Sequence, residues 1–435
     1  MTDFPTRTRI SAGFVLLLSA LTAIGPLTFD TYLAAFPQIA ADLSASPAMV
    51  QFTLTASLAG LALGQVLIGS LSDAFGRRRP LLGALSIYVV ASVAMMFVTS
   101  VGELTALRFV QGFSAAAGMV LSLAIVRDNY SGLQVSKVIA RLMLVVGVAP
   151  ILAPTIGAQL LHFGSWRLIF GFLAAVGAVL FVLATMRLRE SLPVERRRTG
   201  GTGAALRTYR DLLLDRPFVG LALLSALYMS ALFTYVAAST FVFQDGFALN
   251  AQQFGFVFAG GAASITIASQ LYGAMVGRFQ PEQILTGAIA TGVVLATALL
   301  VVALTGGGLV PVTALVILTL GTAGFVMPSA PAIALASNPH RAGSAAALLG
   351  ALQFGIGALV APLTGLLGGN PVIAMAAVMF AMIVLSALLL TGVSRAWRRD
   401  ARAARTATTV RECSDPTLTS APTSPPSPTP ANATT

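Results

Sequence analysis

Two ionisable side chains lie deep inside long apolar segments of this sequence, Asp30 within 11–36 and Arg108 within 104–126. A charge at the centre of a bilayer costs at least ~2.5–3.5 kcal/mol, so such residues usually face a cavity, pair with each other or mark an ion pathway. If the two segments cross a membrane in opposite directions, both residues lie at similar depth. Loss of water favours the protonated form of a carboxyl group and a nearby arginine favours the ionised form, so this arrangement can take up and release a proton.

Asp30 has two interpretations, a proton-coupling acid and a structural partner of Arg108. The segment F-D-T-Y-L-A-A at 29–35 matches F-T-Y-V-A-A at 233–238, and this repeat places Phe233 at the position equivalent to Asp30. A purely structural acid has no obvious reason to occur in only one half, although divergence of the two copies also explains the difference. The proton-coupling role is the favoured interpretation.

Aromatic and amide side chains near these positions are candidates for the wall of a substrate cavity, because aromatic walls suit an amphipathic organic ligand. The candidates are Tyr32, Gln111, Tyr228, Phe233 and Tyr235. Aromatic residues of membrane helices also face lipid or neighbouring helices, so a packing role is the alternative for each of them.

The segment G-V-A-P-I-L-A-P-T-I-G at 147–157 combines close-packing glycines with prolines that remove hydrogen bonds from a helix. We predict a hinge and helix-packing face formed by Gly147, Pro150, Pro154 and Gly157. An ordinary kinked membrane helix is the alternative.

The stretch G-S-L-S-D-A-F-G-R-R-R-P at 69–80 concentrates charge and glycine in one short turn between two apolar runs. We predict that Asp73 docks at the positive N-terminus of the eleventh helix near Gly343 and that Arg77 pairs with Asp128. The turn then acts as a cytoplasmic gate, whose residues are Gly69, Asp73, Gly76, Arg77, Arg78 and Asp128. In the alternative interpretation, the arginines only mark the cytoplasmic side of the membrane.

The elements that must position these residues are membrane helices. Only 9% of the 435 residues are charged and 56% are hydrophobic, whereas soluble domains carry roughly 25% charged residues. Apolar runs of about 20 residues have the length that crosses a bilayer as a helix, and they lack the alternation of a β-barrel strand. The sequence predicts an all-α polytopic membrane protein with twelve spans, near 11–36, 47–71, 80–100, 104–126, 137–161, 166–186, 217–241, 252–276, 282–304, 309–334, 343–367 and 371–393.

Arginine and lysine indicate how the spans are oriented, because cytoplasmic loops are enriched in both. Alternate loops place nearly all of them on one side, with Arg167 on the other. We therefore predict a multi-pass protein of the inner (plasma) membrane with cytoplasmic termini. The net charge of +11 is interpreted as a topology signal, and no nucleic-acid partner is predicted.

The internal repeat divides the helices into two sets of six. Odd spans match odd spans, which indicates two parallel six-helix repeats around a central site. The predicted parts are a cytoplasmic N-terminus (1–10), a first six-helix bundle (11–186), a basic cytoplasmic linker (187–216), a second six-helix bundle (217–393) and a disordered cytoplasmic tail (394–435). The tail is poor in apolar residues, and its basic start either touches anionic lipid or marks the cytoplasmic side.

A membrane enzyme needs convergent acids, histidines or a nucleophile with its base. The chain has a single cysteine, two histidines far apart in sequence, and one acid in mid-membrane. No catalytic residues and no metal site are predicted, and a non-transporting receptor is disfavoured because the tail carries no recognisable signalling module.

Several of these motifs resemble those of the major facilitator superfamily. The turn at 69–80 is similar to its signature between the second and third helices, and R-F-V-Q-G at 108–112 is similar to its fourth-helix motif. The segment 147–157 resembles the fifth-helix motif of drug:proton antiporters, with Ala153-Pro154 where that motif usually has Gly-Pro. Three further pieces narrow the resemblance to the bicyclomycin and chloramphenicol resistance branch with twelve helices: F-D-T-Y-L-A-A-F-P at 29–37, I-V-R-D-N-Y at 125–130, and Trp166-Arg167 with Phe170.

The resemblance implies the major facilitator fold and export of small amphipathic drugs, chloramphenicol- or bicyclomycin-like, in exchange for protons. It implies alternating access, with Asp30 and Arg108 in the coupling site and the proton gradient as energy source in place of any cofactor. The expected partners are the drug, protons and membrane lipid, and the expected functional unit is a monomer. A metabolite exporter or importer on the same scaffold, with a different coupling mode, is the alternative.

Overall fold

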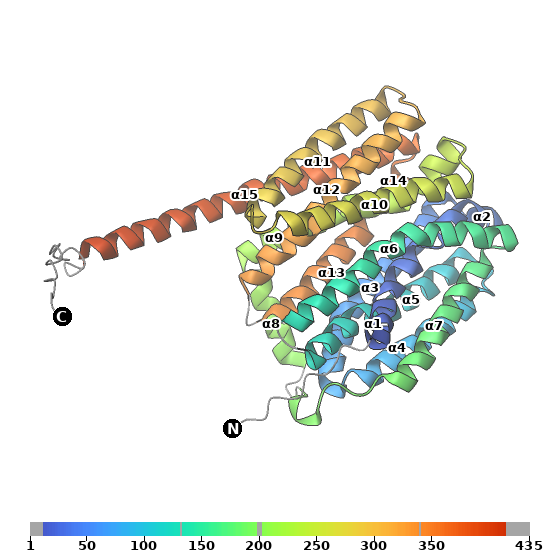
Figure 1. The fold of residues 1–435 in the computed structure, drawn as a ribbon. Helices are drawn as coiled ribbons and strands as arrows, with labels where there is room; N and C mark the ends of the chain where they lie inside the picture. The colour runs from blue at the N-terminus through green and yellow to red at the C-terminus, as the bar shows by residue number, and fades with distance from the viewer. Residues whose placement is uncertain (1–11, 131–132, 198–201, 339–340, 415–435) are drawn as a thin grey trace, which may run out of the picture. The chain divides into compact units, whose positions relative to one another are not determined.

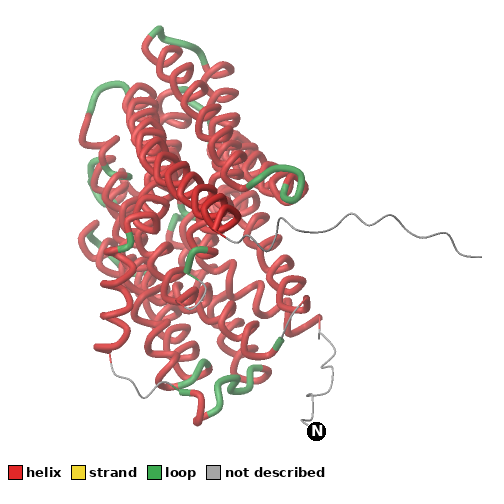
Figure 2. Tube along the Cα trace, turned by 90° about the vertical axis from the view of Figure 1, so that its left-hand side faces the viewer, coloured by secondary structure: helices red, strands yellow, loops and turns green. Residues whose placement is uncertain are grey.

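The computed structural model describes residues 12–130, 133–197, 202–338 and 341–414, which are almost entirely helical (Figure 2). An isolated bridge between Val276 and Phe279 is the one β contact of this described part. In chain order the helical elements are α1 (Ala12–Asp30), η1 (Leu33–Ala35), α2 (Phe36–Asp42), α3 (Pro47–Phe75), α4 (Arg78–Met95), α5 (Val101–Asn129), α6 (Leu133–Phe163), α7 (Arg167–Arg187), η2 (Val194–Arg196), α8 (Thr202–Leu214), α9 (Arg216–Thr240), η3 (Phe241–Gly246), α10 (Ala251–Met275), α11 (Pro281–Leu304), α12 (Leu309–Ala336), α13 (Ala342–Val360), α14 (Leu363–Leu367) and α15 (Pro371–Ser414).

Twelve helical stretches of the described residues have the length and hydropathy of membrane spans, which confirms the predicted all-α, twelve-span fold. Local sequence explains where several of them begin. Ser46 and Ser100 precede α3 and α5, and their hydroxyls accept the backbone N–H groups of Met49 and Glu103. Such caps satisfy donors that a helix start leaves free.

The first half (residues 12–187) is organised around α5, which contacts α1, α3 and α4. In the second half (residues 216–393), α12 contacts α9, α10 and α11 in a similar way. Glycines permit the close approach of α3 to α5, because a Cβ at Gly60 or Gly112 would overlap the backbone of the facing helix.

The two halves meet along two helix pairs, α3 with α13 and α6 with α10 (Figure 1). These contacts are close enough that the helices up to Leu390 form one compact unit, and the chain from Thr391 forms a second. The first compact unit thus includes the described residues of both predicted bundles, 11–186 and 217–393, as far as Leu390, and the division into two bundles stays a prediction.

The two segments predicted to lie outside the membrane, the linker and the tail, both contain helix. Within the linker 187–216, α8 packs against α9 and α13. Helix α15 continues to Ser414, so the described part of the predicted tail, 394–414, is helical, and disorder of the tail stays a prediction. Alanine and arginine, frequent in this segment, have high intrinsic helix propensity. Residues 415–435 and the N-terminal segment 1–10 lie outside the described residues.

Candidate functional site

The first span is interrupted at its buried aspartate. Helix α1 ends at Asp30, Thr31 and Tyr32 form a turn, and η1 then leads into α2. Pro26 lies one turn before this break and lacks a backbone N–H, which weakens the helical hydrogen-bond ladder. A broken membrane helix is tolerated where other groups bind its free carbonyls. Three carbonyls of this span accept hydrogen bonds from side chains of other helices.

Arg108 of α5 binds the first of these carbonyls. Its Nη1 donates to the carbonyl of Thr28 at 3.1 Å and to Gln111 Oε1 at 2.6 Å. The guanidinium carbon lies 3.9 Å from the centre of the Tyr32 ring, within cation–π range. Arg108 is fully buried, and its Nε and Nη2 have no hydrogen-bond partner in the described residues. The predicted site residues Tyr32, Arg108 and Gln111 thus form one cluster.

Asp30 has no ion partner in this conformation. The described residues contain no salt bridge or hydrogen bond to its carboxylate, and the residue is 7% exposed. The Asp30–Arg108 pair, one of the two alternatives from the sequence, is therefore not formed here, because Arg108 binds Thr28 instead. Helix α9 of the second half reaches the α1 break, because Thr240 at its end donates to the carbonyl of Leu33.

The three predicted cavity residues of α9 are buried, but they contact different helices. The Tyr228 hydroxyl lies 2.5 Å from that of Thr322 in α12. The ring centres of Phe233 and Phe354 in α13 are 5.5 Å apart. Tyr235 stacks on an aromatic ring of α10, with centres 5.5 Å apart. Tyr228, Phe233 and Tyr235 thus pack against three different helices of the second half.

Three hydrogen bonds join the halves at the end of the bundle where α2 lies. We call this the opposite end, because it lies opposite the end where α3 finishes and the linker begins. The three bonds run from Thr240 Oγ1 to the Leu33 carbonyl at 3.0 Å, from Gln244 Nε2 to the Ala34 carbonyl at 3.3 Å, and from Thr364 Oγ1 to Gln51 Oε1 at 3.4 Å. The first two tie η1 to the junction of α9 and the π-helical segment η3. Direct bonds between the halves therefore close the opposite end.

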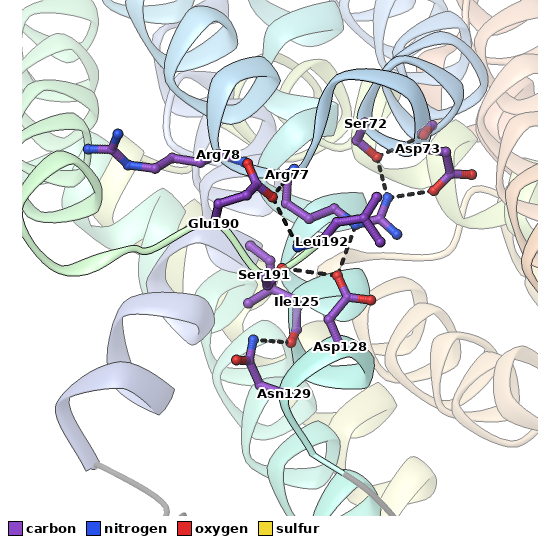
Figure 3. Close-up of polar contacts among 11 residues, drawn as sticks. Ser72, Asp73, Arg77, Arg78, Ile125, Asp128, Asn129, Glu190, Ser191 and Leu192 are labelled. Atoms are coloured by element: carbon purple, nitrogen blue, oxygen red, sulfur yellow. Dashed lines mark hydrogen bonds and ion pairs between the residues drawn. The ribbon is translucent and has the colours of Figure 1, made fainter. Parts of the chain in front are cut away.

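The charged turn at 69–80 forms a cluster at the linker end, where α3 ends and the linker begins (Figure 3). Arg77 Nη1 lies 2.6 Å from Asp73 Oδ1, and Arg77 Nε lies 3.0 Å from Asp128 Oδ2. The predicted pair of Arg77 with Asp128 is confirmed. Burial opposes the charge of Arg77, but hydrogen bonds to the two carboxylates raise its pKa above the ordinary value.

Glu190, which the sequence did not single out, caps the helix that follows this turn. Its carboxylate accepts the backbone N–H of Arg77 at 2.7 Å, of Arg78 at 3.2 Å and of Leu192 at 3.1 Å. Burial opposes ionisation, but these N–H groups and nearby Arg197 hold the pKa of Glu190 below its ordinary value. The only sequence signal is an acid just after α7, because its partner Arg77 lies 113 residues away.

Other predicted gate residues are distributed around this cluster. Gly76 is required, since its φ is 90° and a Cβ would meet the Glu190 carboxylate. Gly69 makes ordinary packing contact, and Arg78 Nη2 donates to a backbone carbonyl of α7 at 2.9 Å. The predicted docking of Asp73 at the start of α13 is absent from the described residues, because its carboxylate binds Arg77.

Helix α6 keeps both prolines of the predicted hinge inside its helical run, at Pro150 and Pro154. Its two glycines face different neighbours. The carbonyl of Gly147 accepts a hydrogen bond from Thr266 of α10 at 3.0 Å. Gly157 packs against the carbonyl of Thr31, which a Cβ at this position would overlap. Helix α6 thus touches both the α1 break and the second half, and its action as a hinge stays a prediction.

The polar side chains of the described residues do not form a candidate metal site. No group of three or more His, Cys, Asp or Glu side chains suited to a metal ion occurs in the described part of the chain. The arrangement around α1 instead combines one carboxylate, one guanidinium and several hydroxyls in an aromatic setting. These groups suit proton exchange and the binding of an organic molecule.

Comparison with known proteins shows what this chain is similar to. The Major Facilitator Superfamily model matches residues 18–362. The uncharacterised MFS-type transporter YdgK of Bacillus subtilis is 38% identical over 89% of this chain and 96% of its own length. A bicyclomycin resistance protein homolog of Haemophilus influenzae is 32% identical over 86% of this chain and 94% of its own length.

Solved structures share the fold at low identity. The nucleoside transporter NupG superposes with a TM-score of 0.70 at 16% identity, covering 88% of this chain and 99% of NupG. At this identity the likeness concerns the arrangement of the helices alone.

Proposed function

Because the chain belongs to the major facilitator superfamily, we propose that it exports small amphipathic compounds in exchange for protons, with Asp30 as the coupling acid. The family makes it a membrane transporter rather than an enzyme. The observation that carries the proposal is the buried carboxylate at the end of α1, which has no ion partner in the described residues. The Haemophilus relative supports a drug substrate, because it is named a bicyclomycin resistance protein homolog.

Coupling follows from how a buried carboxyl group responds to its surroundings. Loss of water favours the protonated form, and a hydrogen-bond donor or a positive charge favours the ionised form. Alternating access changes both, because Asp30 sits where α1 is broken and where the second half approaches. Arg108 supports this role by binding the Thr28 carbonyl and so holding the break in place.

Two ends of the molecule supply the gates. Hydrogen bonds between the halves close the opposite end, whereas the bonds of the Arg77 cluster join the first half only to itself and to the linker. We propose that the linker end is cytoplasmic and loads the drug in this conformation, and that the turn at 69–80 engages the second half when the cavity faces outward. Both termini are then cytoplasmic, and the protein acts as a monomer in the cell membrane.

The test is drug susceptibility and transport with a matched pair of variants. Asp30→Asn removes the carboxylate, and Asp245→Asn serves as control because Asp245 is an exposed acid of the same membrane protein. In a sensitised host challenged with chloramphenicol or bicyclomycin, we expect wild type and Asp245→Asn to protect and Asp30→Asn to fail. Equal protection by Asp30→Asn would remove Asp30 from the mechanism.

The alternative substrate class is a metabolite carried on the same scaffold. Uptake of either antibiotic into everted vesicles separates the two, since a drug:proton antiporter accumulates the drug inside only when a proton gradient is imposed. Transport that ignores the gradient, or that moves drug and protons in the same direction, would exclude antiport and favour the metabolite transporter.

A further inference from the structure

Tyr235 differs from the other buried tyrosines of the described residues in having a hydroxyl without a hydrogen-bond partner. The other three are paired with threonine hydroxyls: Tyr32 with Thr53 at 3.1 Å, Tyr88 with Thr28 at 2.7 Å, and Tyr228 with Thr322 at 2.5 Å. A buried polar group left unpaired costs ~1–3 kcal/mol. A free phenol in a membrane core is therefore expected to have a partner in another state of the protein.

The ring of Tyr235 is held in place by α10. It stacks on Phe258 with an interplanar angle of 25°, and a Cβ at Gly261 would come within 3.4 Å of its hydroxyl. The residue is 2% exposed. Because the ring is packed on one side by α10, its hydroxyl is a fixed donor carried by the second half.

Asp30 lies close to the contact that α9 makes with the first half, because Thr240, five residues after Tyr235, donates to the carbonyl of Leu33, three residues after Asp30. The described residues contain no hydrogen bond or salt bridge to the Asp30 carboxylate, so it has no donor in this conformation. Of the other titratable groups buried near the α1 break, Tyr32 is paired with Thr53 and Tyr88 with Thr28. Arg108 bonds to Thr28 and Gln111 through Nη1, whereas its Nε and Nη2 have no partner in the described residues. The other ionisable residues of the elements packed against α1 and α9 lie toward helix ends or in α8, at Asp73, Glu103, Arg127, Asp128, Lys137, Arg141, His162, Arg167, Arg187, Arg207, Tyr209, Arg210, Asp211, Arg216, Asp245 and Tyr272.

The internal repeat explains why this tyrosine is free. Tyr32 and Tyr235 occupy equivalent positions in F-D-T-Y and F-T-Y. In the first half, the Tyr32 ring stacks under the guanidinium of Arg108. The corresponding part of the second half, 311–316, contains no ionisable residue. The second copy thus keeps the tyrosine without the cation and leaves its hydroxyl available for Asp30.

We propose that Tyr235 is a positioning residue for the coupling acid, whose O–H donates a hydrogen bond to the ionised Asp30 carboxylate as α9 closes on α1. The protonated carboxyl group loses its proton to water in the cavity, and the phenol keeps its own. This inference rests on the proposed function of Asp30. It adds that the second half senses the charge of Asp30 through one hydroxyl, so proton release and closure of the halves are linked.

The test compares Tyr235→Phe with Tyr228→Phe, which removes a hydroxyl from the same helix. Purified protein in detergent is titrated with chloramphenicol and, in parallel, with bicyclomycin, and the released protons are recorded as a function of pH. Without the donor, the ionised form of the Asp30 carboxyl group is less favoured. In Tyr235→Phe we therefore expect the pH at which drug-induced proton release is half-maximal to rise by about one unit. Tyr228→Phe is expected to match the wild type.

Stability provides a check that the variant is folded and distinguishes the two hydroxyls. Removing an unpaired hydroxyl should leave the melting temperature of Tyr235→Phe unchanged or higher, whereas Tyr228→Phe should melt lower because it breaks a bond to Thr322. In an Asp30→Asn background, Tyr235→Phe should have no further effect on transport. An independent loss there would assign Tyr235 to substrate binding and overturn the proposal.

The outcomes also separate this inference from the proposed function. If the wild type releases protons with drug and Tyr235→Phe keeps the wild-type pH midpoint, the role of Tyr235 is refuted and that of Asp30 stands. If the wild type releases no protons with either antibiotic, the proposed antiport fails first. Equal pH shifts in Tyr235→Phe and Tyr228→Phe would also overturn the inference, because they would indicate a general effect of losing a buried hydroxyl.

Discussion

Glu190 provides a test of the charged cluster at the linker end. Its carboxylate accepts the backbone N–H groups of Arg77 and Arg78, where helix α4 begins. Losing a helix cap costs ~1 kcal/mol. An acid at a helix N-terminus adds ~0.3–1 kcal/mol, and exposure to solvent places Glu190 at the low end. We expect Glu190→Ala to lower the free energy of opening the start of α4 by about 1 kcal/mol, or about fivefold in amide exchange.

Hydrogen–deuterium exchange of the peptide that covers 76–82 measures this opening directly. Glu195→Ala is the matched control, because Glu195 is an exposed acid of the same linker with no hydrogen bond in the described residues. We expect the peptide to exchange about fivefold faster in Glu190→Ala and at the wild-type rate in Glu195→Ala. Equal exchange in the two variants would refute the capping role.

The pH dependence follows from the sign of the pKa shift. The pKa of Glu190 in the folded protein lies below its ordinary value of 4.5. Its contribution is therefore complete above pH 4.5 and is lost as the pH falls through the lower, folded-state pKa. Wild type and Glu190→Gln should differ in exchange at neutral pH and converge in acid. A difference that persists unchanged below that range would contradict the electrostatic part of the argument.

Two other substitutions test how the halves pack. Gly157→Ala places a Cβ against a backbone carbonyl at the α1 break, so it should lower the free energy of unfolding by ~1–3 kcal/mol and reduce transport. Gly147→Ala should cost less, because its Cβ meets only a side chain, at 3.3 Å. A higher melting temperature for Gly157→Ala than for Gly147→Ala would contradict the packing. Thr240→Val removes a hydrogen bond between the halves and should speed thiol labelling of an Ala34→Cys reporter at the opposite end. The Thr234 hydroxyl bonds within its own helix, so Thr234→Val should leave the labelling rate unchanged. Equal labelling rates in Thr240→Val and Thr234→Val would remove Thr240 from the gate.

The twelve spans could be predicted because a bilayer requires long apolar helices, and the sequence marks their ends with serine, proline and arginine. The resemblance to the major facilitator superfamily was confirmed by the family model over 18–362. The pair of Arg77 with Asp128 was also predictable, since orientation places the second loop and the end of the fourth helix on one side. Hydropathy and charge are thus sufficient to predict the number and order of the spans.

Side-chain partners at the break were not predictable in the same way. Similar depth suggested that Arg108 meets Asp30, but the break in α1 frees the carbonyl of Thr28, and the guanidinium binds it instead. The cap by Glu190 depends on how the linker folds back over α4. The position of Tyr228 depends on rotation of α9, because seven residues along a helix bring Tyr228 and Tyr235 to one face only approximately. Such details depend on tertiary packing that periodicity does not contain.

The account depends most on Asp30 as the residue that converts a proton gradient into export. The direct measurement is accumulation of radiolabelled chloramphenicol or bicyclomycin in proteoliposomes of the purified protein under an imposed pH gradient. We expect wild type to accumulate drug and Asp30→Asn to equilibrate drug across the membrane without accumulating it. Accumulation by Asp30→Asn at the wild-type level would contradict the account.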